Sequence, residues 1–582
     1  MFDLKIVGGT IVDGTGNDRF VGDIGVKDGV IVTVKRGGGL EGEAAETIDA
    51  TGKVVAPGFV DIHTHYDGQA TWDEVLEPSS QHGVTTIVAG NCGVGFAPVR
   101  PGSEDWLISL MEGVEDIPGT ALHEGMTWGW ESFPEYLDVL ETRNWSIDIG
   151  TQVAHGAVRA YVMGDRGAKN DPATPEDIDE MARLVRESIE AGALGLSTSR
   201  VLGHRAMDGE PVPGTFAAED ELFGLGRAIA AGGGGVFELA PAGADGQDLI
   251  RAPKEVDWMG RLSTELDLPV SFALLEVRSE PELWRELMDE SIKAIDRGAR
   301  LAPQVAIRPF GMLIGFASNH PFAKRPTFKA LADKLPYDEL VAELSTPAVR
   351  DAILAEGDLP PDPSIQFDGL PTALQQMASW LYLLGDKPDY EPTAEMTLAA
   401  QADASGVDAM ALAYEVMLQN NGQSYMIAPF FNYAYENHDV IREMMLHPAG
   451  VSGLSDGGAH CRMICDASYP TYLLTHWARD RKRGKGLSLE FVVKMQTNDT
   501  AQLYGLTDRG VIAEGKKADL NVIDHDRIEL HHPRAANDLP AGGRRLLQDA
   551  SGYEATIVSG TVTRRHGKDT GARPGRLVRG AR

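Results

Sequence analysis

Cysteine is scarce in this sequence, with only Cys92, Cys461 and Cys465 among 582 residues. Cysteines this few and this unevenly placed exclude a disulfide framework and favour a reducing compartment. Cys461 and Cys465 lie four positions apart, but no second pair or histidine cluster accompanies them to complete a structural zinc site. We interpret these two residues as buried thiols.

Long apolar runs are also missing. None approaches the roughly 18 residues that a membrane-spanning helix needs. The opening stretch MFDLKIVGGTIVDG has neither the basic region nor the apolar region of a signal peptide. We therefore expect a cytoplasmic protein that does not bind a membrane.

Positive charge is in short supply, because 53 Lys and Arg face 86 Asp and Glu, for a formal net charge of −33. This charge opposes binding to nucleic acid phosphates and to anionic membrane surfaces. No long run of one sign occurs, so we interpret the acidic residues as a solvated surface. The expected partner is a small-molecule substrate, and the composition is compatible with a homo-oligomer.

Strand-like and helical stretches alternate through the middle of the chain, which predicts an α/β fold with parallel βαβ units. From Phe59 onward, the apolar segments FVDIHTH, GVTTIVAGNCG, DIGTQVAHG, ALGLSTS, GGVFELA and PVSFALL are each followed by polar or helical sequence. Residues 308–436 contain many prolines between helical patches, and we interpret them as an insertion in the later connections of this fold.

The two ends of the chain have β character instead. Residues 1–57 carry short β-rich runs separated by Gly and Asp turns, and residues 505–582 return to the same pattern. We expect both ends to pair into one small β-sandwich domain. The final GARPGRLVRGAR is rich in Gly and Arg and is expected to be a loosely held tail.

A histidine pair closes the first apolar strand of the middle region, in the run Gly58-Phe59-Val60-Asp61-Ile62-His63-Thr64-His65. Side chains alternate faces along a strand, so His63 and His65 point the same way and are spaced to share one metal ion. Two buried imidazoles without partners would cost free energy, which argues against simple core packing. The pair predicts a metal site.

Six segments together identify a family resemblance that spans nearly the whole chain. PGFVDIHTHYD resembles the first-strand signature of the amidohydrolase superfamily, and GNCGVGFAP is similar to its D-aminoacylase, or N-acyl-D-amino-acid deacylase, branch. TQVAHGAVRAYVMG, EAGALGLSTS, the SDGG beginning at Ser455 and ADLNVID follow in the family's order. The resemblance implies a TIM-like (β/α)8 barrel over residues 58–504, with the site at the carboxyl ends of its strands.

The resemblance also implies roles for two further residues. Cys92, in GNCG, corresponds to a zinc ligand of the family, and thiolate is a soft ligand suited to zinc. Asp456 corresponds to the last-strand aspartate that binds the metal and takes a proton from the metal-bound water. Asp456 is therefore the predicted catalytic residue.

The chain departs from the D-aminoacylase pattern at the fifth and sixth strands. Each of those strands ends in a metal-binding histidine in the family, but GGVFELAPAG and PVSFALLEV contain none, and Ala240 and Leu274 or Leu275 occupy those places. We therefore expect a single divalent ion, zinc. Its predicted ligands are His63, His65, Cys92 and Asp456.

Substrate-binding roles are predicted from the same resemblance for His155 and Arg159, in AHGAVR, and for Arg278, which follows the sixth strand. Other polar residues near the predicted site keep open roles. Glu238 and Glu276 suit metal ligands, acid/base groups or structural ion pairs equally well. His155, His204 and His460 are candidate substitutes for the missing histidines.

The predicted function is metal-dependent hydrolysis of an amide C–N bond, in which metal-bound hydroxide attacks the carbonyl of an N-acyl D-amino acid. Two alternatives stay open. One is hydrolysis of a cyclic amide, ester or lactone, or a metal-assisted C–C cleavage, because one barrel supports many reactions through its loops. The other is a non-catalytic relative that retains only a binding role.

Overall fold

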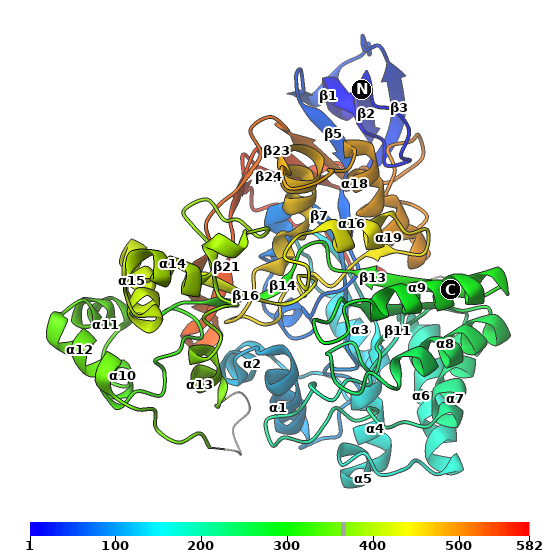
Figure 1. Ribbon diagram of the computed structural model, residues 1–582. Coiled ribbons are helices and arrows are strands. Elements are labelled where there is room, and N and C mark those ends of the chain that lie inside the picture. The colour runs from blue at the N-terminus through cyan, green and yellow to red at the C-terminus, as the bar shows by residue number, and fades with distance from the viewer. Residues whose placement is uncertain (363–367, 581–582) are drawn as a thin grey trace.

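The computed structural model describes residues 1–362 and 368–580 (Figure 1). Eight short parallel strands follow one another around a ring at its centre. Neighbouring strands pair in parallel in chain order, and a parallel bridge between Thr64 and Gly457 joins the last strand to the first. The ring consists of β6 (Phe59–Asp61), β7 (Val84–Ala89), β8 (Asp148–Thr151) continued by β9 (Val153–Ala154), β10 (Gly195–Ser199), β11 (Val236–Ala240), β12 (Pro269–Leu274), β13 (Arg300–Val305) and β17 (Val451–Ser452). This is the arrangement of a (β/α)8 barrel.

Helices alternate with the strands, and in a few of them a side chain caps the first turn. In α6 (Pro175–Ala191), Thr174 and Asp177 form a capping box, and the helix ends at Gly192 with a φ of 116° that glycine adopts without strain. The other helices around the barrel are α1 (Glu104–Glu115), α2 (Gly119–Gly125), α3 (Phe133–Glu141), α4 (His155–Met163), α5 (Asp165–Ala168), α7 (Glu219–Ala231), α8 (Ala252–Leu266), α9 (Leu283–Asp296), α16 (Asp439–Leu446), α17 (Tyr469–Tyr472), α18 (Leu489–Met495) and α19 (Asn498–Leu503). Among the described residues, none of the helices is long and apolar enough to cross a membrane.

A nine-stranded sheet draws its strands from both ends of the chain. Strand β5 (Val54–Pro57) joins them, because it pairs in parallel with β1 (Phe2–Ile11) and antiparallel with β18 (Leu520–Ile523). The other strands are β2 (Phe20–Lys27), β3 (Val30–Arg36), β4 (Ala44–Asp49), β23 (Tyr553–Val558), β24 (Thr561–Arg565) and β25 (Lys568–Asp569). Two small two-stranded sheets lie between β18 and β23 in the sequence. They pair β19 (Glu529–Leu530) with β22 (Ala550–Ser551) and β20 (Arg534–Leu539) with β21 (Gly543–Leu547).

The long connection between β13 and β17 carries its own small sheet and hydrophobic core, and Figure 1 shows its helices projecting from one side of the barrel. The sheet has the order β14 (Phe310–Ile314), β16 (Met426–Phe431), β15 (Tyr382–Leu383). The helices are α10 (Pro326–Ala332), α11 (Tyr337–Leu344), α12 (Pro347–Ala355), α13 (Leu370–Gln375), α14 (Leu398–Ser405) and α15 (Ala409–Gly422). Residues 363–367 of the predicted insertion, and residues 581–582 of the predicted terminal β segment, lie outside the described residues.

The C-terminal segment is bound to the barrel, so the expectation of a loosely held tail is wrong for its described part. The backbone N–H of Val578 donates to the carbonyl of Ile149 at 2.7 Å, and Leu577 forms a parallel bridge to Ile149. The tail takes this edge of β8 because the next strand, β10, pairs with β9 instead. Val578 also packs against apolar side chains at the starts of the barrel strands, among them Val60 and Leu194.

Candidate metal centre

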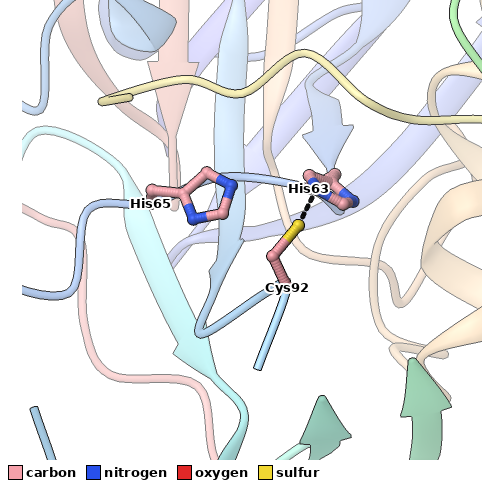
Figure 2. A group of neighbouring side chains, drawn as sticks. All are labelled: His63, His65 and Cys92. Carbon is pink, nitrogen blue, oxygen red and sulfur yellow. Dashed lines mark hydrogen bonds between the residues drawn. The ribbon is translucent and has the colours of Figure 1, made fainter. Parts of the chain in front are cut away.

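Three donor side chains converge where β6 and β7 end. Figure 2 shows His63, His65 and Cys92 facing one another, and one donor atom from each lies within 4.8 Å of the others. The Cys92 Sγ is 3.5 Å from Nε2 of His63. Cys92 adopts a φ of 55°, in the left-handed region that a cysteine rarely occupies. Backbone strain of this kind is typical of functional sites.

Asp456 joins the cluster from the other side of the barrel seam. Its Oδ1 lies 3.3 Å from Nε2 of His63 and 3.6 Å from Nε2 of His65. The backbone N–H of Asp456 donates to the carbonyl of His63, and the neighbouring Ser455 hydroxyl donates to Asp61 at 2.6 Å. The structure therefore brings together all four predicted metal ligands.

Gln304, on β13, orients the His63 ring. The His63 Nδ1 lies 2.8 Å from Oε1 of Gln304, and an amide oxygen only accepts, so Nδ1 carries the proton and Nε2 is left free as a ligand. The Gln304 amide is itself fixed, because its nitrogen donates to the Ser271 hydroxyl at 3.0 Å. Sequence reasoning missed Gln304, since a polar residue within an apolar strand was its only signal.

Glu115, the last residue of α1, lies behind His65. Its Oε1 is 3.4 Å from Nδ1 of His65, and its Oε2 is 3.6 Å from Nε2 of His460. Only 1% of Glu115 is exposed. Sequence reasoning missed this residue, although it carries a signal: Glu115 and Asp116 place negative charge at the carboxyl end of a helix, where the helix dipole opposes it.

Burial and mutual repulsion shape the charges at the cluster. Burial, reinforced by the carboxylates of Glu115, Glu238 and Asp456, raises the pKa of the Cys92 thiol well above its usual value. Burial lowers the pKa of His63 to about 4, so the imidazole is neutral near pH 7. For Asp456 burial acts to raise the pKa, but the surrounding histidines outweigh it and lower the value. Neutral imidazoles and an ionised carboxylate are the forms that bind metals.

The donor set fits a zinc ion. Imidazole nitrogen, thiolate sulfur and carboxylate oxygen are the three ligand types of zinc sites. Both ring nitrogens of His65 are buried without a hydrogen-bond partner, and so is Oε1 of Glu238. Buried polar atoms of this kind cost free energy unless something binds them, and a cation would do so.

The comparisons with known proteins agree with this chemistry. The sequence profile of the amidohydrolase family matches residues 46–564. The chain belongs to this family. An Alcaligenes xylosoxydans xylosoxydans D-aminoacylase is 27% identical to this amidohydrolase over 587 residues, which cover 99% of this chain and 97% of the relative. An uncharacterized protein of Mycobacterium tuberculosis (strain ATCC 25618 / H37Rv) is 28% identical over 605 residues, covering 97% and 92%.

Solved structures share the fold of this amidohydrolase. A D-aminoacylase, described with a binuclear metal centre and with one-metal activation and second-metal attenuation, covers 100% of both chains at 23% identity and a TM-score of 0.64. An N-acyl-D-glutamate deacylase from Bordetella bronchiseptica, complexed with zinc and a phosphonate inhibitor, covers 99% of both chains at 23% identity and a TM-score of 0.65. The predicted family and fold class are confirmed.

The fifth and sixth strands of the amidohydrolase end without histidines, at Ala240 and Leu274, which are both buried. One layer deeper in the barrel, Glu238 on β11 accepts the backbone N–H of Cys92 at 3.2 Å and places Oε1 3.6 Å from Nδ1 of His63. Burial raises the pKa of Glu238 to about 8. Glu238 thus lies beneath the predicted metal ligands, where its carboxyl group faces the His63 ring.

His155 and Arg159 of the amidohydrolase point into a separate buried network. The two His155 ring nitrogens face Thr198 and Glu221, each at 2.9 Å. Arg159 Nε donates to the same Glu221 carboxylate at 2.7 Å. Burial acts to raise the pKa of Glu221, but His155 and Arg159 together lower it to about 2. Their substrate-binding role stays a prediction that would require Glu221 to give up these partners.

Arg278 lies where the sixth-strand loop meets the insertion. Its guanidinium stacks over the Trp380 ring at 4.5 Å from the centroid, and its weak hydrogen bond to the Tyr433 carbonyl is 3.5 Å long. Glu276, two residues earlier, accepts the Ala434 N–H at 3.0 Å, and burial raises its pKa to about 7. Arg278 is therefore held by weak contacts at the carboxyl side of the barrel.

His204 comes close to the cluster from the loop after β10. Its Nδ1 forms a hydrogen bond with the Ser199 hydroxyl at 2.9 Å. Burial lowers the pKa of His204 to about 3, and the charges of His460, His65 and Asp456 also act on it. Of the histidines considered as substitutes, the structure brings His204 and His460 toward the predicted metal ligands.

A second group of metal-type side chains, Glu391, His438 and His476, lies elsewhere in the described part of the chain. Arg481 donates to both carboxylate oxygens of Glu391, at 3.1 and 2.9 Å. His438 Nε2 donates to the Tyr390 carbonyl at 2.8 Å. Because Arg481 already supplies the positive charge, we interpret this group as a structural network.

Proposed function

We propose that this amidohydrolase removes the acyl group from N-acyl-D-amino acids. The observation that carries the proposal is the position of Asp456, 3.3 Å from Nε2 of His63 and 3.6 Å from Nε2 of His65, at the carboxyl ends of the barrel strands. Active sites of such barrels lie at this end. A D-aminoacylase that matches nearly the full length of the chain supports the choice of substrate class.

One zinc ion, held by His63, His65, Cys92 and Asp456, is sufficient for this reaction. Such an ion polarises a carbonyl oxygen and lowers the pKa of water to about 7. His63 would present Nε2 to the ion, because Gln304 holds the proton of the His63 ring on Nδ1. The three cysteines of the chain are all unpaired, which supports the predicted reducing, cytoplasmic compartment.

Asp456 carries the proton transfer in this proposal. Its carboxylate is ionised, because the neighbouring histidines lower its pKa, and it therefore accepts the proton of the attacking water. The same carboxylate then returns that proton to the leaving nitrogen, which departs as a free amine. The backbone hydrogen bond from the N–H of Asp456 to the carbonyl of His63 holds Asp456 in place for both steps.

Arg278 is the proposed partner of the substrate's carboxylate. No ion pair of the described residues joins its guanidinium to a carboxylate, although its charge acts on the nearby Glu276, and Trp380 supports its planar face. An arginine binds a carboxylate through two parallel hydrogen bonds. Glu276, with one oxygen buried and unpaired, lies beside it and disfavours a second negative group on the substrate.

The test is hydrolysis of a panel of N-acetyl D- and L-amino acids by zinc-loaded protein, with cyclic amides, lactones and simple esters alongside. We expect the enzyme to release free D-amino acids from N-acetyl-D-amino acids with uncharged side chains. The corresponding L-substrates should be hydrolysed more slowly. Turnover confined to the cyclic substrates would replace the proposal with the cyclic-amide alternative. Full zinc occupancy without turnover of any compound would favour a non-catalytic relative.

A further inference from the structure

Two segments that are far apart in the sequence are joined where β12 ends. The carboxyl end of β12 carries no histidine, and hydrogen bonds to the end of the insertion hold this stretch of chain. The Asn432 N–H donates to the carbonyl of Glu276 at 3.0 Å, and Val277 forms an antiparallel bridge to Phe431. The chain that follows β16 is therefore paired with the chain that follows β12.

Asn432 lies at the centre of this junction. Its Oδ1 accepts the N–H of Glu276 at 2.7 Å, and its Nδ2 donates to the carbonyl of Ala306, the first residue after β13, at 3.2 Å. We call the three hydrogen bonds of Asn432 with Glu276 and Ala306 the Asn432 clamp. Asn432 is fully buried and has a φ of 60°. Asparagine tolerates this left-handed conformation better than most residues, and its amide supplies both an acceptor and a donor.

Arg278 lies two residues after Glu276, and the insertion contacts its side chain as well. The guanidinium stacks over Trp380 at 4.5 Å from the ring centroid and donates to the Tyr433 carbonyl at 3.5 Å. Because Tyr433 follows Asn432 directly, the clamp sets the distance between the backbone that carries Arg278 and the carbonyl that Arg278 contacts. A hydrogen bond of this length is weak, and a long arginine side chain loses conformational freedom when it is ordered. The two contacts therefore depend on the clamp to bring them into register.

We propose that the insertion positions Arg278 for the carboxylate of the substrate, with Asn432 as the positioning residue and Trp380 as a second support. An arginine binds a carboxylate through two parallel hydrogen bonds, which require a defined orientation of its planar group. Asn432 does not touch the substrate in this scheme and acts through Arg278 alone. The inference rests on the substrate-binding role that the proposed function gives to Arg278.

The experiment removes the clamp and measures the effect on substrate binding. Asn432→Gly deletes the side chain and leaves a residue that adopts a positive φ without strain. Steady-state kinetics of the zinc-loaded protein on N-acetyl-D-leucine should show a KM raised by about 10- to 100-fold, the range that a misplacement of about 1 Å can reach. We expect kcat and zinc content to change little, because the clamp lies outside the predicted metal ligands.

Three further variants separate positioning from general destabilisation. Asn421→Gly is the matched control and should leave KM unchanged, because Asn421 is an exposed asparagine of the insertion with a φ of 56°. Asn432→Asp keeps the shape and the acceptor for the Glu276 N–H, so it should restore most of the substrate affinity. Asn432→Gly combined with Arg278→Met should have a KM no higher than Arg278→Met alone, because the clamp acts through that arginine.

Two kinetic results would overturn the inference. One is a lower melting temperature in Asn432→Gly with an unchanged KM, and the other is an equal rise in KM with and without Arg278. If Asn432→Gly does not fold, Trp380→Leu takes its place, since Trp380 is 41% exposed and its replacement leaves the core intact. It should raise KM only when Arg278 is present, and an unchanged KM would likewise overturn the inference.

Labelling of Arg278 with phenylglyoxal, followed by peptide mass spectrometry, tests the positioning without a substrate. Asn432→Gly should be labelled faster at Arg278 than wild type and Asn421→Gly. Faster labelling in a protein that hydrolyses no N-acyl amino acid would reject the proposed function and keep the positioning of Arg278. Equal labelling rates together with equal KM values would reject the positioning, whatever the substrate.

Discussion

The Asp456 carboxylate lies 3.3 Å from Nε2 of His63, on the line where the last barrel strand meets the first. Hydrogen bonding across this seam fixes both residues, because the Asp456 N–H donates to the His63 carbonyl. The proposed metal binding and proton transfer therefore both depend on the closure of the barrel.

Replacing Asp456 by Asn should abolish turnover while leaving the fold intact. Asparagine keeps the shape but does not accept the proton, and general acid–base catalysis contributes about 10²- to 10⁴-fold to rate. We expect at least a 100-fold loss of kcat, measured on the hydrolysed substrate with metal content determined in the same sample. Asp257→Asn, on the exposed face of α8, is the control; unchanged kcat in fully loaded Asp456→Asn would refute the assigned role.

Cys92→Ser should weaken zinc binding. A serine hydroxyl replaces the soft thiolate, and the loss should be at least the 10- to 100-fold that removal of an outer-shell partner typically costs. Competition with a chromogenic chelator measures the dissociation constant. Cys465→Ser, which alters another buried thiol outside the cluster, should leave zinc affinity unchanged, and equal affinities in the two variants would contradict the role of Cys92.

Gln304→Met should also weaken zinc binding, by about 10- to 100-fold, because the His63 ring loses the acceptor that sets its tautomer. Gln304→Glu restores an acceptor and should recover most of the affinity. The same chelator competition checks both. If Gln304 has only a structural role, Gln304→Met should lower the melting temperature, and Gln304→Glu should not restore metal affinity. That result would exclude the positioning role.

Arg278→Met should raise KM for N-acyl amino acids with little change in kcat. The substitution keeps much of the side-chain volume but removes a charge-assisted hydrogen bond worth about 1.5 to 3 kcal/mol, which corresponds to roughly 10- to 150-fold. Steady-state kinetics on the best D-substrate measures the effect. Arg285→Met, which changes a partly exposed arginine paired with Glu443, serves as the control. A fall in kcat at constant KM would contradict a substrate-binding role for Arg278.

Glu276 should make stability fall as the pH rises toward neutrality. Burial raises its pKa from 4.5 to about 7, so between these values the folded protein holds a proton that the unfolded chain has released. This stabilising contribution is complete below about pH 4.5 and is lost as the pH passes 7. Melting temperatures from about pH 5 to 8 should decline less steeply in Glu276→Gln than in wild type. Identical slopes, with exposed Glu280→Gln as the control, would show that Glu276 is not the group responsible.

Much of the architecture, and the metal-binding character of the site, could be predicted from the sequence. The apolar strands ending in HTH and GNCG predicted the carboxyl-end site, because strand alternation places His63 and His65 on one face whatever surrounds them. The sequence alone also shows that the strands VFELA and PVSFAL contain no histidine. These features are local, and the physics of a single strand decides them.

Only the tertiary structure decided which distant side chains meet that site. Glu115 reaches His65 because the loop after β17 binds the end of α1, and Gln304 reaches His63 across the barrel from β13. The same packing turns His155 toward Glu221, away from the metal cluster. Such contacts join elements far apart in the chain, and they depend on strand order, loop closure and the burial of charge, none of which a local pattern of residues specifies.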